Sequence, residues 1–94
     1  MSETGASDNQ QHYINAAMQP IEVMQKLLSK EQFEGFLLGN QIKYSMRAGL
    51  KQGGEHSDII KRNQYAYWLD LVRKGATISP TKDCVPINYI YRGL

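Results

Sequence analysis

Apolar residues recur at helical spacing in the first half of the chain. In residues 20–28 the apolar positions follow the period of a helix, and Pro20 suits its first turn. A second helical pattern opens at Ser29, where Gln32 stands three residues on, as in a capping box. The pattern continues to Leu50 with large apolar residues at helical intervals. Two consecutive helices are therefore predicted.

A third helix is predicted after residues 52–54, whose sequence Gln-Gly-Gly is a stop signal. It begins near residues 55–58 and runs to Lys74, followed by Gly75 in the position that favours a left-handed backbone. Gly39 lies in the middle of the second helix, where glycine costs about 1 kcal/mol relative to alanine. It indicates either a close helix–helix approach or a local irregularity. The fold class expected is mainly α, a compact three-helix domain.

Both ends of the chain differ from this helical part. Residues 1–11 are polar and small after the initiator methionine, so they are predicted to form a disordered arm. Residues 12–75 form the helical domain. Residues 76–94 contain two prolines and short β-type pieces, which predict an extended tail packed on the core or on a neighbouring subunit, or a short edge strand. A core this small is marginal alone, so a homo-oligomer is expected.

Charge is distributed unevenly along the chain. Residues 1–39 contain five acidic residues and two lysines, whereas residues 40–74 contain seven cationic and three acidic residues. This suits a phosphate-bearing partner but falls short of the dense basic patch of a nucleic-acid binder, so nucleic acid is not expected as a partner. The single cysteine, Cys84, excludes an internal disulfide, and no apolar run is long enough for a membrane span. A cytoplasmic protein is expected.

The most informative feature is one face of the second predicted helix. At 3.6 residues per turn, Asn40, Lys43, Tyr44, Arg47 and Lys51 share this face over about 16 Å. The amide can donate and accept, the lysines carry point charges, and the guanidinium fork matches phosphate or carboxylate. We expect this face to bind an anionic ligand. An ordinary solvated helix face is the alternative, and for Tyr44 a core phenol that bonds across helices is favoured over catalysis.

Two further residues can complete such a site. Asp58, across the Gly-Gly turn, can orient Arg47 toward a ligand, or bind a ribose hydroxyl or a metal. Equally, it can stabilise the start of the third helix or pair with Arg47 or Lys51 as a plain salt bridge. His12 can stack or transfer protons over the Asn40–Arg47 face. The favoured role for this region, however, is a hydrophobic staple formed by its neighbours Tyr13 and Ile14.

No established catalytic or metal-binding motif accompanies these residues. The chain lacks a GxxxxGK[ST] loop, and its two histidines lack zinc-site spacing, so no metal site is predicted. Cys84 is followed by Val-Pro and is not expected to be a nucleophile. Whether the protein is an enzyme stays open at this point.

The same residues carry a family resemblance. The segment 39–47 reads Gly-Asn-x-Ile-Lys-Tyr-x-x-Arg. Residues 58–69 read Asp-Ile-Ile-Lys-Arg-Asn-x-x-x-Tyr-Trp-Leu, in which the tyrosine and tryptophan are Tyr67 and Trp68. Together with His12-Tyr13 and residues 19–24, they resemble a small domain of unknown function common in tailed bacteriophages. Members of that family are often labelled nucleotide kinase, because a similar domain occurs in a short-tailed coliphage enzyme that phosphorylates deoxynucleoside monophosphates without a Walker motif. This chain is much shorter, and it has Arg62-Asn63 where the family tends to have Lys-Ala.

The resemblance implies a phage protein in the cytoplasm of an infected bacterium, with nucleotide handling at Asn40, Lys43, Arg47 and Asp58. Our first hypothesis is therefore a small nucleotide-binding protein, either a minimal nucleotide kinase or a nucleotide-sequestering protein, with Mg²⁺ as an accompanying ion. The alternative is a non-enzymatic inhibitor that binds a host enzyme or defence complex. The tail residues Tyr89, Tyr91 and Arg92 are of the types favoured at interface hot spots.

Overall fold

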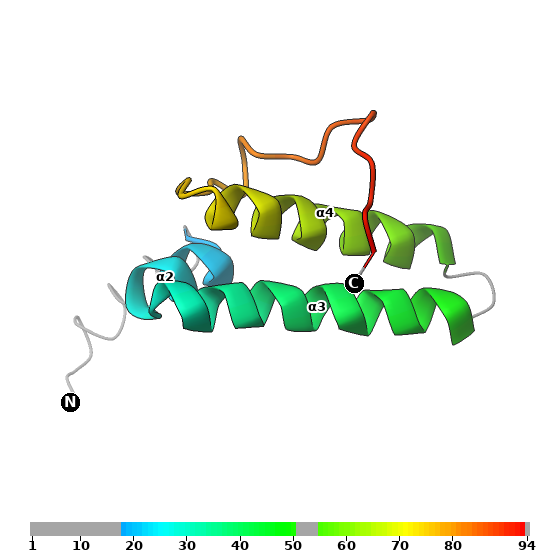
Figure 1. Cartoon of the computed structure of the whole chain (residues 1–94), viewed down its shortest axis with the longest axis horizontal. Coiled ribbons are helices and arrows are strands. Elements are labelled where there is room, and N and C mark those ends of the chain that lie inside the picture. Colours follow the sequence, from blue (N-terminus) through cyan, green and yellow to red (C-terminus); the bar gives the residue numbers. More distant parts are fainter. Residues whose placement is uncertain (1–17, 51–54, 94) are drawn as a thin grey trace, which may run out of the picture.

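The computed structural model describes residues 18–50 and 55–93, and within these residues it contains three helices and no strand. Helix α2 spans Pro20–Leu27, α3 spans Lys30–Leu50 and α4 spans Glu55–Arg73. Figure 1 shows α3 and α4 as a long antiparallel pair, with α2 beside the end where α3 begins. The tail leaves the end of α4, runs back along that helix and ends near the middle of α3. The mainly α, three-helix fold is thus confirmed.

Local capping explains why the helices begin and end where they do. The backbone N–H of Ser29 donates to Gln32 Oε1 at 2.9 Å, and the N–H of Gln32 donates to Ser29 Oγ at 3.1 Å, which confirms the capping box. Gln19 and Glu22 form a similar box before α2. Gly75 ends α4 with φ of 93°, a backbone conformation that other residues rarely adopt. The predicted helix bounds therefore lie within a few residues of the observed ones.

The core lies where the start of α3 and the second half of α4 meet α2 and the first part of the tail. Leu37 is completely buried there and Phe33 nearly so. The other buried members of the cluster are Ile21, Trp68, Leu69, Val72 and Ile78. Burying one such side chain contributes about 1.5–3 kcal/mol. Because Ile78 belongs to the tail, the tail completes the core of its own chain.

Gly39 does not have the role expected for it. Helix α3 is continuous through this residue, and a Cβ added to Gly39 would find no atom within 4 Å. The local irregularity is therefore wrong, and among the described residues no close helix approach occurs at Gly39. The physical reason is that Gly39 lies on the side of α3 that faces away from α4, where no described residue comes within 4 Å.

The tail is held by side-chain amides instead of a β-ladder. Gln25 donates from Nε2 to the carbonyl of Ile78 and accepts from its N–H, both at 2.9 Å. Gln64 makes the same kind of double contact with Asp83 O and Val85 N, each at 3.0 Å. Near the end of the tail, Gln41 Nε2 donates to Gly93 O at 3.2 Å. These three glutamines satisfy tail backbone groups that would otherwise need a neighbouring strand.

Several predicted features fall outside the described residues: the disordered arm 1–11, His12, Lys51 and the turn at 52–54. No helix in the described ranges is both long enough and apolar enough to cross a membrane.

Candidate functional site

Tyr44 is the centre of the face predicted from the sequence. Its ring stacks on Tyr65 of α4, with centroids 5.8 Å apart and planes 13° from parallel. Tyr65 is in turn held by edge contacts to Phe36 and Trp68, with centroids 6.2 and 5.4 Å away. The half-buried Tyr44 ring is therefore fixed in position by aromatic packing that leads back to the core.

Three cations gather around this ring. The ammonium of Lys43 lies 4.8 Å from the ring centroid, the guanidinium carbon of Arg47 5.5 Å, and the ammonium of Lys61 5.5 Å. The negative face of an aromatic ring attracts such groups, but each contact contributes only about 0.5–1 kcal/mol at an exposed site. The ring alone therefore does not balance three positive charges.

Asp58 is the carboxylate of this site. It is 2% exposed, and its Oδ1 lies 3.8 Å from Nε of Arg47, whose side chain is 44% exposed. The position of Asp58 in the first turn of α4 favours a negative charge there. Its Oδ2 is buried and has no hydrogen-bond partner among the described residues. A buried carboxylate oxygen without a donor is costly, so this atom is suited to accept a hydrogen bond from a ligand or a water molecule.

The structure therefore brings together four of the residues proposed from the sequence: Lys43, Tyr44, Arg47 and Asp58. The salt bridge between Asp58 and Arg47 is confirmed, at 3.8 Å between Oδ1 and Nε. Oδ2 of Asp58 has no hydrogen-bond partner among the described residues. We refer to these four residues and Lys61 as the Tyr44 cluster. Tyr44 itself stacks across helices, and no hydrogen bond is found for its hydroxyl among the described residues.

Two other predicted residues have different positions. Asn40 is half-buried and donates from Nδ2 to the carbonyl of Phe36, one turn earlier on α3, at 2.9 Å, so its amide is occupied within the helix. Lys51 and His12 lie outside the described residues. Lys61 was not among the predicted site residues. Its place one turn before Tyr65 and three residues after Asp58 is the sequence signal that points to it.

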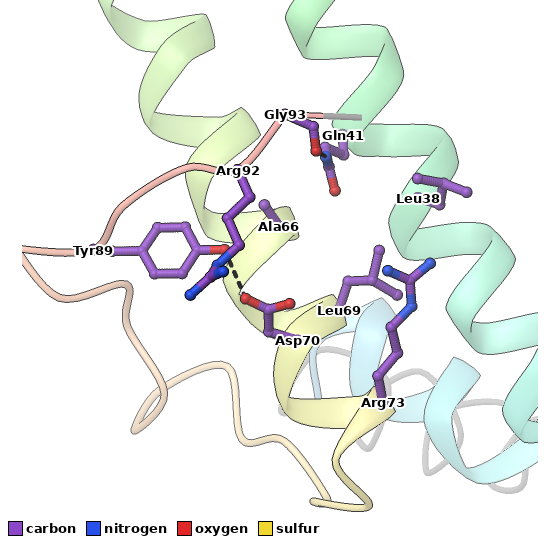
Figure 2. A pocket seen from close by; sticks show the side chains of 9 residues that line it. All are labelled: Leu38, Gln41, Ala66, Leu69, Asp70, Arg73, Tyr89, Arg92 and Gly93. Carbon is purple, nitrogen blue, oxygen red and sulfur yellow. Dashed lines mark hydrogen bonds between the residues drawn. The ribbon is translucent and has the colours of Figure 1, made fainter.

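A second candidate region is a pocket of about 280 Å³ between α3, α4 and the tail. Figure 2 shows Arg92 reaching from the tail toward Asp70, while Arg73 extends from the end of α4. The hydroxyl of Tyr89 donates to Asp70 Oδ2 at 3.0 Å. Burial and this bond to the carboxylate raise the pKa of Tyr89 to about 12.

The pocket and the Tyr44 cluster differ in charge balance. Arg73 lies 3.8 Å from Glu34, and Asp70 shares the pocket with Arg92, so two cations are matched by two carboxylates. The Tyr44 cluster holds three cations and one carboxylate. An anionic ligand therefore finds the larger excess of positive charge at the Tyr44 cluster. The described residues contain no group of three or more potential metal-ligating side chains.

Comparison with known proteins places the chain in a sequence family. The model of the family described as "Protein of unknown function (DUF3310)" matches residues 7–67, about two thirds of the chain. This range includes every member of the Tyr44 cluster, whereas Arg73, Tyr89 and Arg92 of the pocket lie beyond it. No curated protein matches the chain. No solved structure matches it either.

Proposed function

Because the chain belongs to the DUF3310 family, whose function is unknown, we propose a function from the site itself: the Tyr44 cluster binds a nucleotide or a similar phosphorylated small molecule. The proposal includes a phage protein acting in the cytoplasm of an infected bacterium, as the resemblance of residues 39–47 suggests. The observation that carries it is the convergence of Lys43, Arg47 and Lys61 on one ring with a single carboxylate nearby.

Each group has a chemical part to play in this proposal. Arg47 offers a planar fork of donors for phosphate oxygens, and the two lysines add point charges that need no fixed geometry. Oδ2 of Asp58 has no partner among the described residues and would accept a hydrogen bond from a sugar hydroxyl or an amide N–H once local opening of the site makes it accessible. The Tyr44 and Tyr65 pair supplies an aromatic wall for the base.

Binding without turnover and nucleotide kinase activity are two forms of the same proposal. Phosphoryl transfer depends mainly on positioning and on stabilising the charge of the transferred group, which a cluster of cations provides. A kinase also has to take a proton from the attacking hydroxyl. Asp58 is the carboxylate of the cluster, but at 2% exposure it could accept this proton only if the Arg47 side chain moves aside. Mg²⁺ would accompany the nucleotide phosphates.

The test is thermal unfolding of the full chain with nucleoside mono-, di- and triphosphates and cyclic dinucleotides, with and without Mg²⁺. A ligand at 100 times its dissociation constant adds about 2.7 kcal/mol of stability. We expect a phosphate-dependent rise in melting temperature that is lost in Lys61→Gln. This variant is preferable to Arg47→Gln, because Arg47 also balances the buried Asp58.

Arg73→Gln is the matched control, since it removes the same charge from the other candidate region. If Arg73→Gln abolishes the shift and Lys61→Gln keeps it, the ligand site is the pocket of Figure 2 and the proposal is wrong. No shift with any member of the panel also contradicts it. Product analysis with the ligand that binds then separates kinase activity from sequestration.

One observation favours the second candidate function, binding to a host protein. In the tail, Ile87 and Ile90 are fully and 77% exposed, respectively, whereas the predicted hot-spot residues Tyr89 and Tyr91 are half-buried against the chain itself. Exposed isoleucines on a well-anchored loop suit an apolar contact with a partner. A stoichiometric host partner recovered with the natural chain and lost with Ile87→Asp plus Ile90→Asp supports this function. Equal recovery with both chains contradicts it.

A further inference from the structure

Tyr91, near the end of the tail, contacts both long helices. Its hydroxyl lies 3.2 Å from Oγ of Ser45 and 3.5 Å from Nε2 of Gln41, and both of these residues belong to α3. Its ring lies under Arg62 of α4, whose guanidinium carbon is 3.9 Å from the ring centroid. Figure 1 shows the tail ending near the middle of α3, which is the part of the helix where these contacts are made. One tail side chain therefore joins α3 to α4.

The partners of Tyr91 are themselves held in place. Oγ of Ser45 donates to the carbonyl of Gln41 at 2.8 Å, so the Tyr91 hydroxyl is the donor in its contact with Ser45. Gln41 is 4% exposed. Arg62 donates from Nε and Nη2 to Oδ1 of Asn63, at 3.2 and 3.1 Å, which fixes its guanidinium over the ring. Tyr91 is thus bound on both helices to groups that have little freedom to move.

These contacts lie at the same level of the helix pair as the Tyr44 cluster. Ser45 follows Tyr44 in α3, and Arg62 follows Lys61 in α4. Consecutive residues of a helix are only about 1.5 Å apart along its axis but point about 100° apart around it. Lys61 meets Tyr44 on one side of the seam between α3 and α4. Ser45 and Arg62 meet Tyr91 on the other side of the same seam.

The apolar core does not extend to this level of the helix pair. No described residue of α3 beyond Leu37 is both apolar and buried, and the buried residue in that part of the helix is Gln41. At the facing end of α4, the buried side chain among the described residues is that of Asp58, which is also polar. Close apolar packing aligns the two helices elsewhere. Here the alignment depends on aromatic stacking and on polar contacts, and those of Tyr91 are among them.

We propose that Tyr91 is a positioning residue of the Tyr44 cluster: it clamps α3 to α4 and so sets the spacing of cations that come from both helices. This inference rests on the proposed function of the cluster. Lys43 and Arg47 belong to α3 and Lys61 to α4, so the alignment of the pair decides how well a phosphate chain reaches all three. Groups that are held in place before binding lose less free energy when a ligand orders them. The tail lies beyond the residues that match the family, so the clamp is built outside the shared domain.

The first test needs no ligand. Proton NMR cross-peaks between the rings of Tyr44 and Tyr65 report the alignment of the helices, because these rings stack across the pair at 5.8 Å. We expect the cross-peaks to weaken slightly in Tyr91→Phe, which loses the hydroxyl, and strongly in Tyr91→Ala, which also loses the ring. Tyr89→Phe is the matched control, because it removes a tail hydroxyl that bonds to Asp70 instead, and it should keep the cross-peaks. Unchanged cross-peaks in a folded Tyr91→Ala variant overturn the proposal.

The core provides an internal control for folding in the same spectra. Tyr91 lies outside the core cluster, so the methyl signals of Leu37 and Val72 should keep their native positions in both Tyr91 variants. If Tyr91→Ala loses these signals, the comparison of Tyr91→Phe with Tyr89→Phe decides. Equal ring cross-peaks in those two variants then overturn the proposal.

The second test measures the binding of inorganic triphosphate to the full chain by calorimetry, because this probe depends on the spacing of the cations and not on a base. We expect the dissociation constant to rise about fivefold or more in Tyr91→Ala, and by less than about twofold in Tyr89→Phe. Unchanged affinity in Tyr91→Ala overturns the positioning role. A natural chain that does not bind triphosphate counts against the proposed function, whereas the ring cross-peaks still decide whether Tyr91 clamps the helices.

Discussion

The two sides of the α3–α4 pair satisfy their polar groups to very different degrees. On the tail side, Gln25 and Gln64 each make two hydrogen bonds to tail backbone, and the indole N–H of Trp68 donates to Asp83 O at 2.8 Å. On the Tyr44 side, three cations share one ring, and a buried carboxylate oxygen of Asp58 has no partner among the described residues.

This difference suggests that one side of the molecule mainly stabilises the fold, whereas the other is available to bind a ligand. Polar groups that are paired with each other stabilise the fold and have little left to offer a ligand. Exposed polar groups without partners contribute little to stability and a buried one lowers it, so a ligand that supplies the missing contacts can gain from both. We therefore expect substitutions on the tail side to change the free energy of unfolding, and substitutions in the Tyr44 cluster to change binding.

The largest effect is expected for Ile78→Ala. Ile78 is 3% exposed and anchors the tail in the core, so its truncation should lower the free energy of unfolding by about 2–5 kcal/mol in urea titrations. Ile87→Ala, at the exposed part of the tail, serves as the control and should change it very little. Similar small losses in both variants would mean that the tail does not belong to the cooperative unit.

Gln25→Ala is expected to have the next largest effect. It removes both partners of the Ile78 backbone, leaving a half-buried donor and acceptor unpaired, at a cost of about 1–3 kcal/mol. The neighbouring Lys26→Ala is the matched control on the same helix, because Lys26 is exposed. Hydrogen exchange should show the amide of Ile78 losing protection in Gln25→Ala and keeping it in Lys26→Ala.

Tyr89 should make the tail side sensitive to alkaline pH. Its pKa is about 12 in the folded protein, mainly through burial and the bond to Asp70, and near 10 when unfolded. Because the folded pKa is the higher one, the contribution of Tyr89 is fully present below pH 10 and is lost as the pH rises toward 12. The stability difference between the natural chain and Tyr89→Phe should therefore be constant below pH 10 and change above it. A difference that is flat up to pH 12 would contradict the bond to Asp70.

The smallest effect on stability is expected in the Tyr44 cluster. Lys61 is exposed and has no carboxylate partner among the described residues, so Lys61→Gln should change the free energy of unfolding by less than about 0.5 kcal/mol. Its nucleotide-dependent melting shift should nevertheless disappear. A loss of stability above about 1 kcal/mol would show that the cluster is structural and would remove the contrast between the two sides.

The helices could be predicted because their signals are local. The capping box at Ser29, Pro20 in a first turn and Gly75 after α4 each act within a few residues, so the sequence displays them directly. The role of Gly39 could not be predicted, because a glycine within a helix can mark either an irregularity or a close approach, and the sequence does not show which side of α3 faces the core. The packing of the tail could not be predicted, because amide side chains that bind a distant backbone leave no periodic pattern.

The candidate site was predictable in part for the same reason. Lys43, Tyr44 and Arg47 lie within about one turn of one helix, so helical spacing alone groups them. Lys61 lies on α4, so its place beside Tyr44 depends on how α3 and α4 align. The stacking of Tyr44 on Tyr65 fixes that alignment, and it is seen only in the structure. The pocket around Arg92 depends on the path of the tail and had no sequence signal at all.

Trp68, the single tryptophan of the chain, contacts both the tail and the aromatic residues next to Tyr44. Its indole N–H is bonded to tail backbone, and its ring meets the edge of Tyr65, on which Tyr44 stacks. Undocking of the tail would expose the indole to water and shift its emission to the red. Occupation of the Tyr44 cluster leaves the indole buried, so ligand binding alone should not produce this red shift. The protein thus carries an intrinsic fluorescent probe for the release of the tail, without any added label.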